Sequence, residues 1–401
     1  MTPAKIRPLA WVLLAAAGTF ALTMGARQSM GLYLSALNTH TGLGIASISL
    51  AFAFGQLWWG LTQPLAGIVA DRVGAGRVLF AGVLLVALGT ALVPFMHSTG
   101  GLILAIGVLA AGGAGMAGPS VLMAATTRLV PAQLRGLATG IVNAGGSFGQ
   151  FVFAPIAQGV TAAAGWIVSL QTLAALSLLA LPAAWVLRGS SNAAGTAPAE
   201  GTRAAIARAL RDPSYRMLCA GFFVCGFHVA FIATHLPGVV AACQLPPEIG
   251  AWSIAVIGLF NIVGSFGMGW AVGRWRMKSL LSLVYAARAV AVLAFMLAPK
   301  TPAVMLAFAA VIGLTFLSTV PPTAGLVAKF FGPAHMATLF GIVMLAHQLG
   351  GFLGAYFGGK AFEWTGSYDW MWYADIVLAV GASLVHLPIR EERLAPRAAA
   401  A

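Results

Sequence analysis

The chain has 401 residues, of which 60% are hydrophobic and only 8% are charged. Soluble domains carry about 25% charged residues, so this composition excludes a soluble globular protein and indicates a polytopic membrane protein. The formal net charge of +13 would suggest nucleic-acid binding in a soluble chain, but in a membrane protein the placement of Lys and Arg matters more than their sum. Cys219, Cys225 and Cys243 have no metal-ligand spacing, and we expect no metal and no cofactor.

Twelve apolar segments follow one another along the chain. A bilayer core of about 30 Å requires a helix of about 20 apolar residues, so each segment predicts one transmembrane span. An even number of spans places both termini on the same side. The predicted spans cover residues 11–33, 46–69, 78–96, 101–127, 137–161, 166–187, 216–240, 249–272, 279–298, 302–328, 335–358 and 370–388.

A short polar interruption separates spans 2 and 3. Asp71 and Arg72 end span 2, which contains Gly67; Gly74 permits a tight turn, and Arg77 begins span 3. This stretch resembles the loop signature of the major facilitator superfamily, in which the acidic residue holds the second span against a neighbouring helix end. The resemblance implies a structural or gating role for these five residues. A reverse turn with a solvated charge pair is the alternative.

The longest connection lies between spans 6 and 7. It begins as a Gly, Ser and Ala-rich linker and ends in a basic stretch that could lie on the membrane surface. We therefore expect an N-terminal six-helix bundle at residues 1–188, a cytoplasmic linker at 189–213 and a C-terminal bundle at 214–401. With a cytoplasmic N-terminus, most of the 22 Lys and Arg residues fall inside, and only Lys300 and Lys360 fall outside.

The two halves of the chain repeat weakly at an offset of about 201 residues. Pro119 falls on Pro321 and Arg128 falls on Lys329 at this offset. Parallel repeats of this kind are typical of transporters. The predicted fold class is therefore an all-α membrane protein with twelve transmembrane helices in two pseudo-symmetric six-helix bundles, which is the major facilitator fold.

Such a fold implies a central cavity between the bundles. Polar residues at mid-depth in a span are costly in lipid, so they should face this cavity or pair with each other. Arg27 in span 1 and His228 in span 7 are related by the repeat offset and could together clamp an anion. The alternative for Arg27 is that its side chain reaches to the outer interface.

Arg288 in span 9 and Asp375 in span 12 are two further charges placed inside spans. A guanidinium cannot shed its proton, so Arg288 needs a partner. We expect a structural pair between Arg288 and Asp375. Substrate binding by Arg288, or its interaction with another residue, are the alternatives.

Several neutral polar residues also lie at mid-depth. His347 in span 11 is a candidate for proton coupling, as is His228, because imidazole titrates near neutral pH. Gly354 and Gly358 follow His347 and form a small-residue ridge for close helix packing. Cavity-facing and helix-packing roles both stay open for His347 and for the amides. The amide candidates for substrate binding are Asn143, Gln150, Asn261 and Gln348.

The chain as a whole resembles the monocarboxylate-transporter-like and oxalate/formate-antiporter-like branch of the superfamily. In that branch a basic residue of span 1 handles the substrate carboxylate, and Arg27 matches it. The branch also uses an arginine in span 8, where this chain has Asn261 at mid-depth. The resemblance implies a secondary active transporter of a small organic anion, of the monocarboxylate class, that works by alternating access with proton symport or anion exchange.

We expect no enzyme activity, because the chain has no catalytic cluster and no phosphate-binding or metalloprotease motif. The expected partners are the organic anion, a proton or counter-anion and the lipid bilayer, with no nucleic acid. We expect a monomer in a bacterial inner membrane with both termini cytoplasmic. The alternative function is a proton-coupled exporter of hydrophobic or cationic compounds, which would need a buried acid in the cavity.

Overall fold

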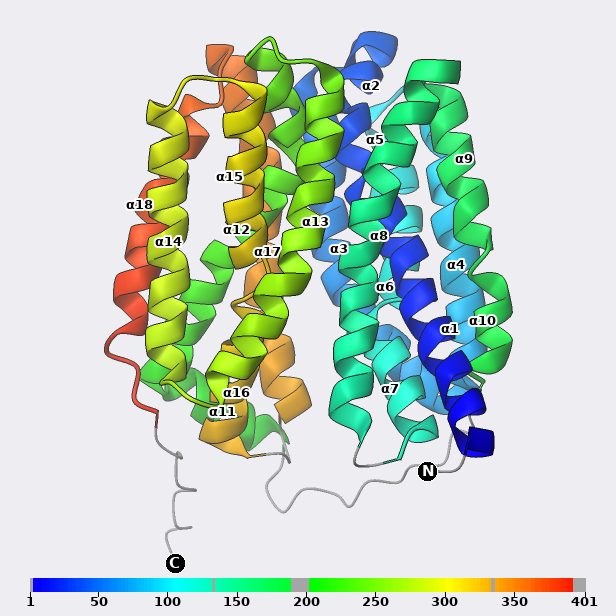
Figure 1. The fold of residues 1–401 in the computed structure, drawn as a ribbon, viewed down its shortest axis with the longest axis vertical. Coiled ribbons are helices and arrows are strands. Elements are labelled where there is room, and N and C mark those ends of the chain that lie inside the picture. The colour runs from blue at the N-terminus through cyan, green and yellow to red at the C-terminus, as the bar shows by residue number, and fades with distance from the viewer. Residues whose placement is uncertain (1–2, 132–133, 189–201, 333–335, 392–401) are drawn as a thin grey trace, which may run out of the picture.

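The computed structural model describes residues 3–131, 134–188, 202–332 and 336–391, and every regular element in these ranges is a helix (Figure 1). The first bundle contains α1 (Pro3–Gln28), η1 (Met30–Tyr33), α2 (Leu34–Thr41), α3 (Ile45–Val73), α4 (Ala75–Leu92), η2 (Val93–Phe95), α5 (Thr99–Leu102), η3 (Ile103–Ala111), α6 (Gly112–Met116), α7 (Pro119–Leu129), α8 (Arg135–Ala164), α9 (Trp166–Leu178) and α10 (Leu181–Val186). The second contains α11 (Thr202–Arg211), α12 (Pro213–Ala242), α13 (Pro247–Val272), α14 (Met277–Leu297), α15 (Pro302–Thr315), α16 (Val320–Phe331), α17 (Met336–Thr365) and α18 (Asp369–His386).

Helices long enough to cross a membrane account for every predicted span. In the described residues, ten stretches are long and apolar enough to cross by length and composition. The other two predicted spans coincide with α8 and α18. The first stretch is longer than predicted and runs from Leu9 to Thr41, because η1 and α2 continue it. The all-α fold with twelve spans is therefore confirmed.

The two bundles are built alike at their closest helix contacts. α1 packs against α8 in the first bundle, and α12 packs against α17 in the second. A side chain added at Gly149 would overlap the carbonyl of Ala21, and one added at Gly354 would overlap the carbonyl of Phe227. Gly358 lies against the ring of His235. The close packing expected at Gly354 and Gly358 is confirmed.

Two equivalent spans are broken near their middle. In the fourth span, α6 ends at Met116 and α7 begins at Pro119, and in the tenth, α15 ends at Thr315 and α16 begins at Val320. Proline lacks an N–H and suits the first turn of a helix. Pro119 and Pro321, which match at the repeat offset, therefore restart the helix in each half.

The turn between α3 and α4 has the predicted form. Gly74 is the single residue between the two helices and has φ of 93°, which favours glycine. Its N–H donates to the carbonyl of Ala70 at 2.9 Å. Arg72 and Arg77 are exposed, and Gly67 has open space beside it. The side chain of Asp71 lies outside the described part of the chain, so its anchoring role stays a prediction.

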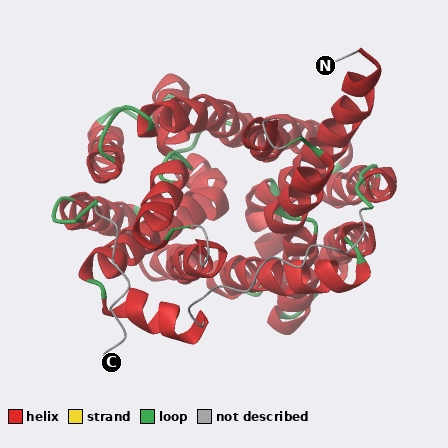
Figure 2. Cartoon of the chain, turned by 90° about the horizontal axis from the view of Figure 1, so that it is seen from below, coloured by secondary structure: helices red, strands yellow, loops and turns green. Residues whose placement is uncertain are grey.

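Residues 189–201 of the predicted linker also lie outside the described residues, so the bundle boundaries at 188 and 214 stay predictions. Figure 1 shows α11 at the same end of the molecule as the start of α1 and the end of α18. Figure 2 looks along the helices from this end, which we call the α11 end.

Two helix pairs make most of the contact between the bundles, α3 with α17 and α8 with α13, and α12 also packs against η1, α2 and α3. Along α3, the contacts run from Ala46, which lies near Gly359, to Gly60, which lies against Gln348. Beyond Gly60, toward the α11 end, Leu65 is exposed. Figure 1 likewise shows α8 and α13 diverging toward the α11 end. The contact between the bundles therefore lies mainly toward the opposite end.

Candidate functional site

Arg27 lies inside the protein, near the middle of the first membrane stretch. Its Nη2 donates to Oε1 of Gln56 on α3, and its guanidinium lies 4.8 Å from the centre of the Trp59 ring. Because the stretch continues to Thr41, Arg27 is more than three helical turns from its outer end, and it is held by neighbours within the protein. The alternative in which Arg27 reaches to the outer interface is therefore wrong.

A pocket opens beside this guanidinium. Five elements of the first bundle line it, and Ala233 and Thr234 of α12 contribute from the second bundle. The buried hydroxyl of Thr90 has no hydrogen-bond partner among the described residues. The pocket combines one cation with a few polar groups and a mostly apolar wall. Its lining residues are Arg27, Gln28, Met30, Gly31, Phe52, Gly55, Gln56, Val86, Thr90, Ile106, Ala110, Ala111, Ala233 and Thr234.

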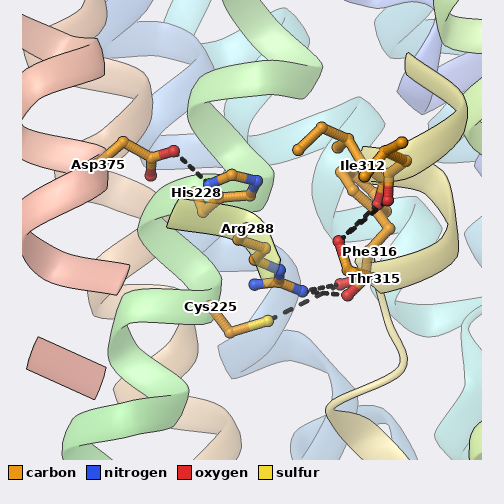
Figure 3. A network of polar contacts seen from close by, with 8 residues as sticks. Cys225, His228, Arg288, Ile312, Thr315, Phe316 and Asp375 are labelled. Atoms are coloured by element: carbon orange, nitrogen blue, oxygen red, sulfur yellow. Dashed lines mark hydrogen bonds and ion pairs between the residues drawn. The ribbon is translucent and has the colours of Figure 1, made fainter. Parts of the chain in front are cut away.

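His228 does not line this pocket. Its Nδ1 lies 2.5 Å from Oδ2 of Asp375 on α18, and both side chains are buried (Figure 3). The expected clamp of Arg27 and His228 around one anion is therefore wrong. The repeat offset relates the two positions along the chain, but His228 points toward α18, within its own bundle.

Arg288 is held by main-chain carbonyls. Its Nη2 donates to the carbonyl oxygens of Thr315 and Phe316, the latter at 2.7 Å, where α15 ends (Figure 3). Its Nε and Nη1 have no hydrogen-bond partner in the described residues. The expected pair of Arg288 with Asp375 is not formed, because Asp375 contacts His228. The structure agrees with the alternative in which Arg288 interacts with another group, here the main-chain carbonyls of Thr315 and Phe316.

His347 and Gln348 lie on α17, buried near the contact with α3. The His347 ring centre is 4.9 Å from that of Phe222, and Gln348 packs against Gly60 of the other bundle. His347 Nδ1 and Gln348 Nε2 have no hydrogen-bond partner in the part of the chain that is described. Neither residue lines the Arg27 pocket, and their roles in substrate binding stay predictions.

Asn261 forms hydrogen bonds between helices. Its Nδ2 donates to Ser147 Oγ of α8 at 2.8 Å, and its Oδ1 accepts from the N–H of Leu317 at 3.0 Å and from Ser265 Oγ at 3.3 Å. Ser147 belongs to the first bundle, and Leu317 lies in the break of the tenth span. The Asn261 side chain therefore connects the first bundle to this break in the second bundle. The helix-packing alternative fits Asn261 better than a substrate contact.

Gln150 and Asn143 occupy the same face of α8 at different depths. Gln150 is buried and packs on Gly258 of α13. Asn143, two turns nearer the α11 end, is exposed. The face is therefore covered where the bundles meet and open where they diverge.

Gln56, Trp59 and Thr90 were not predicted as site residues. Gln56 is a polar side chain at mid-depth in span 2, so the rule that selected Arg27 would also have found it. Trp59 and Thr90 carry no comparable signal, because aromatic and hydroxyl side chains are common in spans for packing reasons.

Twelve spans in two related bundles, with a partly buried cation at a pocket between them, define a secondary transporter rather than an enzyme. The family model described as the Major Facilitator Superfamily matches residues 15–355 and also residues 221–399. The chain belongs to the Major Facilitator Superfamily and is a multi-pass membrane transporter.

Named relatives cover nearly the whole chain. Monocarboxylate transporter 13 of Rattus norvegicus is 26% identical over 94% of this chain and 88% of its own length. An uncharacterised MFS-type transporter of Bacillus subtilis, YcxA, is 22% identical over 94% of this chain and 93% of its own length.

Solved structures share the fold. A bacterial homologue of the human lysosomal transporter Spinster, in an inward-facing and occupied conformation, has a TM-score of 0.74 at 14% identity, over 94% of this chain and 96% of its own. A D-xylose–proton symporter has a TM-score of 0.70 at 15% identity, over 96% and 99%. At these identities the likeness concerns the fold alone.

Proposed function

We propose that this protein is a secondary active transporter that moves a small organic anion of the monocarboxylate class by alternating access. The observation that carries the proposal is the setting of Arg27. Its guanidinium lines a pocket between the bundles, and its hydrogen-bond partner in the described residues is the neutral amide of Gln56. A partly buried guanidinium inside a membrane span without a carboxylate is costly, so an anionic ligand would stabilise it.

The pocket also favours a small ligand with an apolar portion. Its wall consists mainly of Phe52, Val86, Ile106 and alanines. A carboxylate can accept two parallel hydrogen bonds from a guanidinium. A bound carboxylate would therefore either replace Gln56 as the acceptor of Arg27 or bind to Arg27 alongside Gln56. The name of the rat relative, a monocarboxylate transporter, supports the same class of substrate.

We place the α11 end in the cytoplasm of a bacterium, with both termini there and the protein in the inner membrane as a monomer. Arg72, Arg77, Arg203 and Arg211 are exposed at or near this end, whereas Lys300 lies at the other end of α14. The positive-inside rule supports this orientation. It would make the present conformation one in which the bundles diverge toward the cytoplasm.

Transport of the anion would be coupled to a proton or to a counter-anion, with His228 and His347 as candidate proton carriers. The alternative of an exporter of cationic compounds needs an acid in the pocket. Asp375 is bound to His228 and does not line that pocket, so we do not propose this alternative.

A thermal-shift screen of the detergent-solubilised protein tests the proposal. A ligand that binds only the folded state at about 100 times its Kd stabilises it by about 2.7 kcal/mol. We expect at least one of pyruvate, L-lactate, formate and oxalate to raise the Tm of the wild type. Arg27→Gln should lose this shift, whereas Arg211→Gln, which removes an exposed guanidinium from α11, should keep it. An undiminished shift in Arg27→Gln, or no shift with any of these acids in the wild type, would refute the proposal.

A further inference from the structure

The second bundle contains a buried charged cluster that the Arg27 pocket does not use. His228 and Asp375 form its centre, 2.5 Å apart, with both side chains buried. His228 Nε2 and Asp375 Oδ1 each lack a hydrogen-bond partner in the described residues. The pair therefore holds one proton between its bonded atoms and has two further buried sites at which a second proton could bind.

Arg288 lies against the same stretch of α12. Cys225 Sγ and Arg288 Nη2 both approach the carbonyl oxygen of Phe316, at 3.9 and 2.7 Å, and Cys225 is one helical turn from His228. With Asp375 ionised and His228 neutral, the cluster contains one negative and one positive charge. A second proton on the pair leaves Arg288 uncompensated, and buried charges are weakly screened from one another.

The surrounding helices supply no second buried acid in their described residues. The buried titratable or charged side chains on the elements packed around the pair are Tyr215, Cys225 and His235 on α12, Tyr285 and Arg288 on α14, His347 on α17 and His386 on α18. Asp375 is thus the one buried carboxylate of this cluster, and its charge state decides the balance with Arg288.

One peptide group connects this cluster to the contact between the bundles. The carbonyl of Phe316 accepts from Arg288, and the N–H of Leu317, in the same peptide unit, donates to Asn261 Oδ1. Asn261 Nδ2 then donates to Ser147 of the first bundle. This peptide lies in the break between α15 and α16, where no regular helix fixes its orientation. A rotation that changes one of its hydrogen bonds must change the other.

We propose that His228 and Asp375 form the proton-binding site of the transporter, and that Arg288 and the Phe316–Leu317 peptide pass the protonation state of this pair to the contact between the bundles. A proton from solution binds the pair and later leaves to the opposite side, with no other bond made or broken. The extra positive charge favours entry of an anion at Arg27, and the anion in turn favours the proton, as linkage requires. This inference rests on the proposed function and names the coupling ion and its site.

Distance measurements between spin labels test the inference without any organic anion. Labels at Leu137→Cys on α8 and Trp270→Cys on α13, both exposed, report how far the bundles diverge at the α11 end. Cys219 and Cys243 are replaced by serine in this background. In the protein that keeps His228 and Asp375, the distance distribution should differ between about pH 8 and about pH 5.5. Asp375→Asn and His228→Gln should abolish this shift.

The matched control is Glu363→Gln, which removes a carboxylate that pairs with Lys360 near the opposite end of α17, and it should respond as the wild type does. His228→Gln provides the result if Asp375→Asn does not fold. A wild-type pH response in either folded variant, or no response in the wild type, overturns the inference. No carboxylate ligand is present in this experiment. Such a result would therefore not bear on anion binding at Arg27, which the thermal-shift screen tests.

The relay is tested separately with Ser147→Ala, which removes the acceptor of Asn261 in the first bundle. Coupling through a relay of this kind is worth about 0.5–2 kcal/mol, so the pH-induced change in the population ratio should fall by about 2- to 30-fold. Thr172→Ala removes an exposed hydroxyl that bonds only within α9, and it should leave the ratio unchanged. An unaltered response in Ser147→Ala would exclude the peptide relay.

Discussion

The two arginines inside the spans are accommodated in different ways. Arg288 donates to carbonyl groups at the end of α15, which have no partner within their helix. Lipid could not satisfy these groups, so Arg288 has a structural task. Arg27 donates to a side-chain amide and leaves an open pocket beside it. This difference is the reason for placing the anion at Arg27.

The His228–Asp375 contact predicts a coupled loss of stability. Removing one partner of a buried pair costs about 3–5 kcal/mol, because the other is left without compensation. His228→Ala and Asp375→Ala should each lower the Tm in detergent, and the double variant should be less unstable than the two losses summed. The matched cycle of Arg288→Ala with Asp375→Ala should show a smaller coupling, because these two side chains interact only through their charges and share no hydrogen bond in the described residues. Coupling in the second cycle and additivity in the first would restore the pair expected from the sequence.

Depth in the membrane could be predicted from the sequence for Arg27, Arg288 and Asp375, since apolar flanks fix it. The partner of each charged side chain could not be predicted from the sequence. Arg288 and His228 both belong to helices that pack against α18, and the one that meets Asp375 depends on how each helix is rotated about its axis. Hydropathy does not carry that information.

Helices that cross closely depend on glycine at defined positions. An added Cβ at Gly149 of α8 would overlap the main chain of Ala21 on α1. Overpacking of this kind costs about 1–3 kcal/mol. Gly149→Ala should therefore lower the Tm. Gly159 lies in the same helix with open space around it, so Gly159→Ala should leave the free energy of unfolding unchanged or raise it by up to about 1 kcal/mol. Equal effects at the two positions would contradict the packing of α1 on α8.

The spans themselves follow from hydrophobic length, which is why all twelve predicted segments coincide with helices. Their interruptions are less visible in composition. Pro119 and Pro321 mark where two spans restart, but the peptide between Phe316 and Leu317, with its hydrogen bonds to Arg288 and Asn261, depends on contacts among three helices. A single sequence contains no signal for such a contact.

In the whole molecule, two similar bundles meet along α3 with α17 and along α8 with α13, and they diverge toward the α11 end. Alternating access requires these contacts to open while equivalent ones close at the other end. The hydrogen bond of Asn261 with Ser147 and the packing of Gln348 on Gly60 lie at this contact. Both contacts would have to break when the bundles separate here, and the proposed anion site is at Arg27.

Uptake of radiolabelled pyruvate and L-lactate into proteoliposomes tests the central claim most directly. With an inwardly directed proton gradient, or with unlabelled anion inside, the wild type should accumulate at least one of the two acids. Loss of a charge-assisted hydrogen bond costs about 1.5–3 kcal/mol, so Arg27→Gln should reduce the uptake rate by at least about tenfold while Arg211→Gln retains it. Uptake by Arg27→Gln at the wild-type rate would contradict the account.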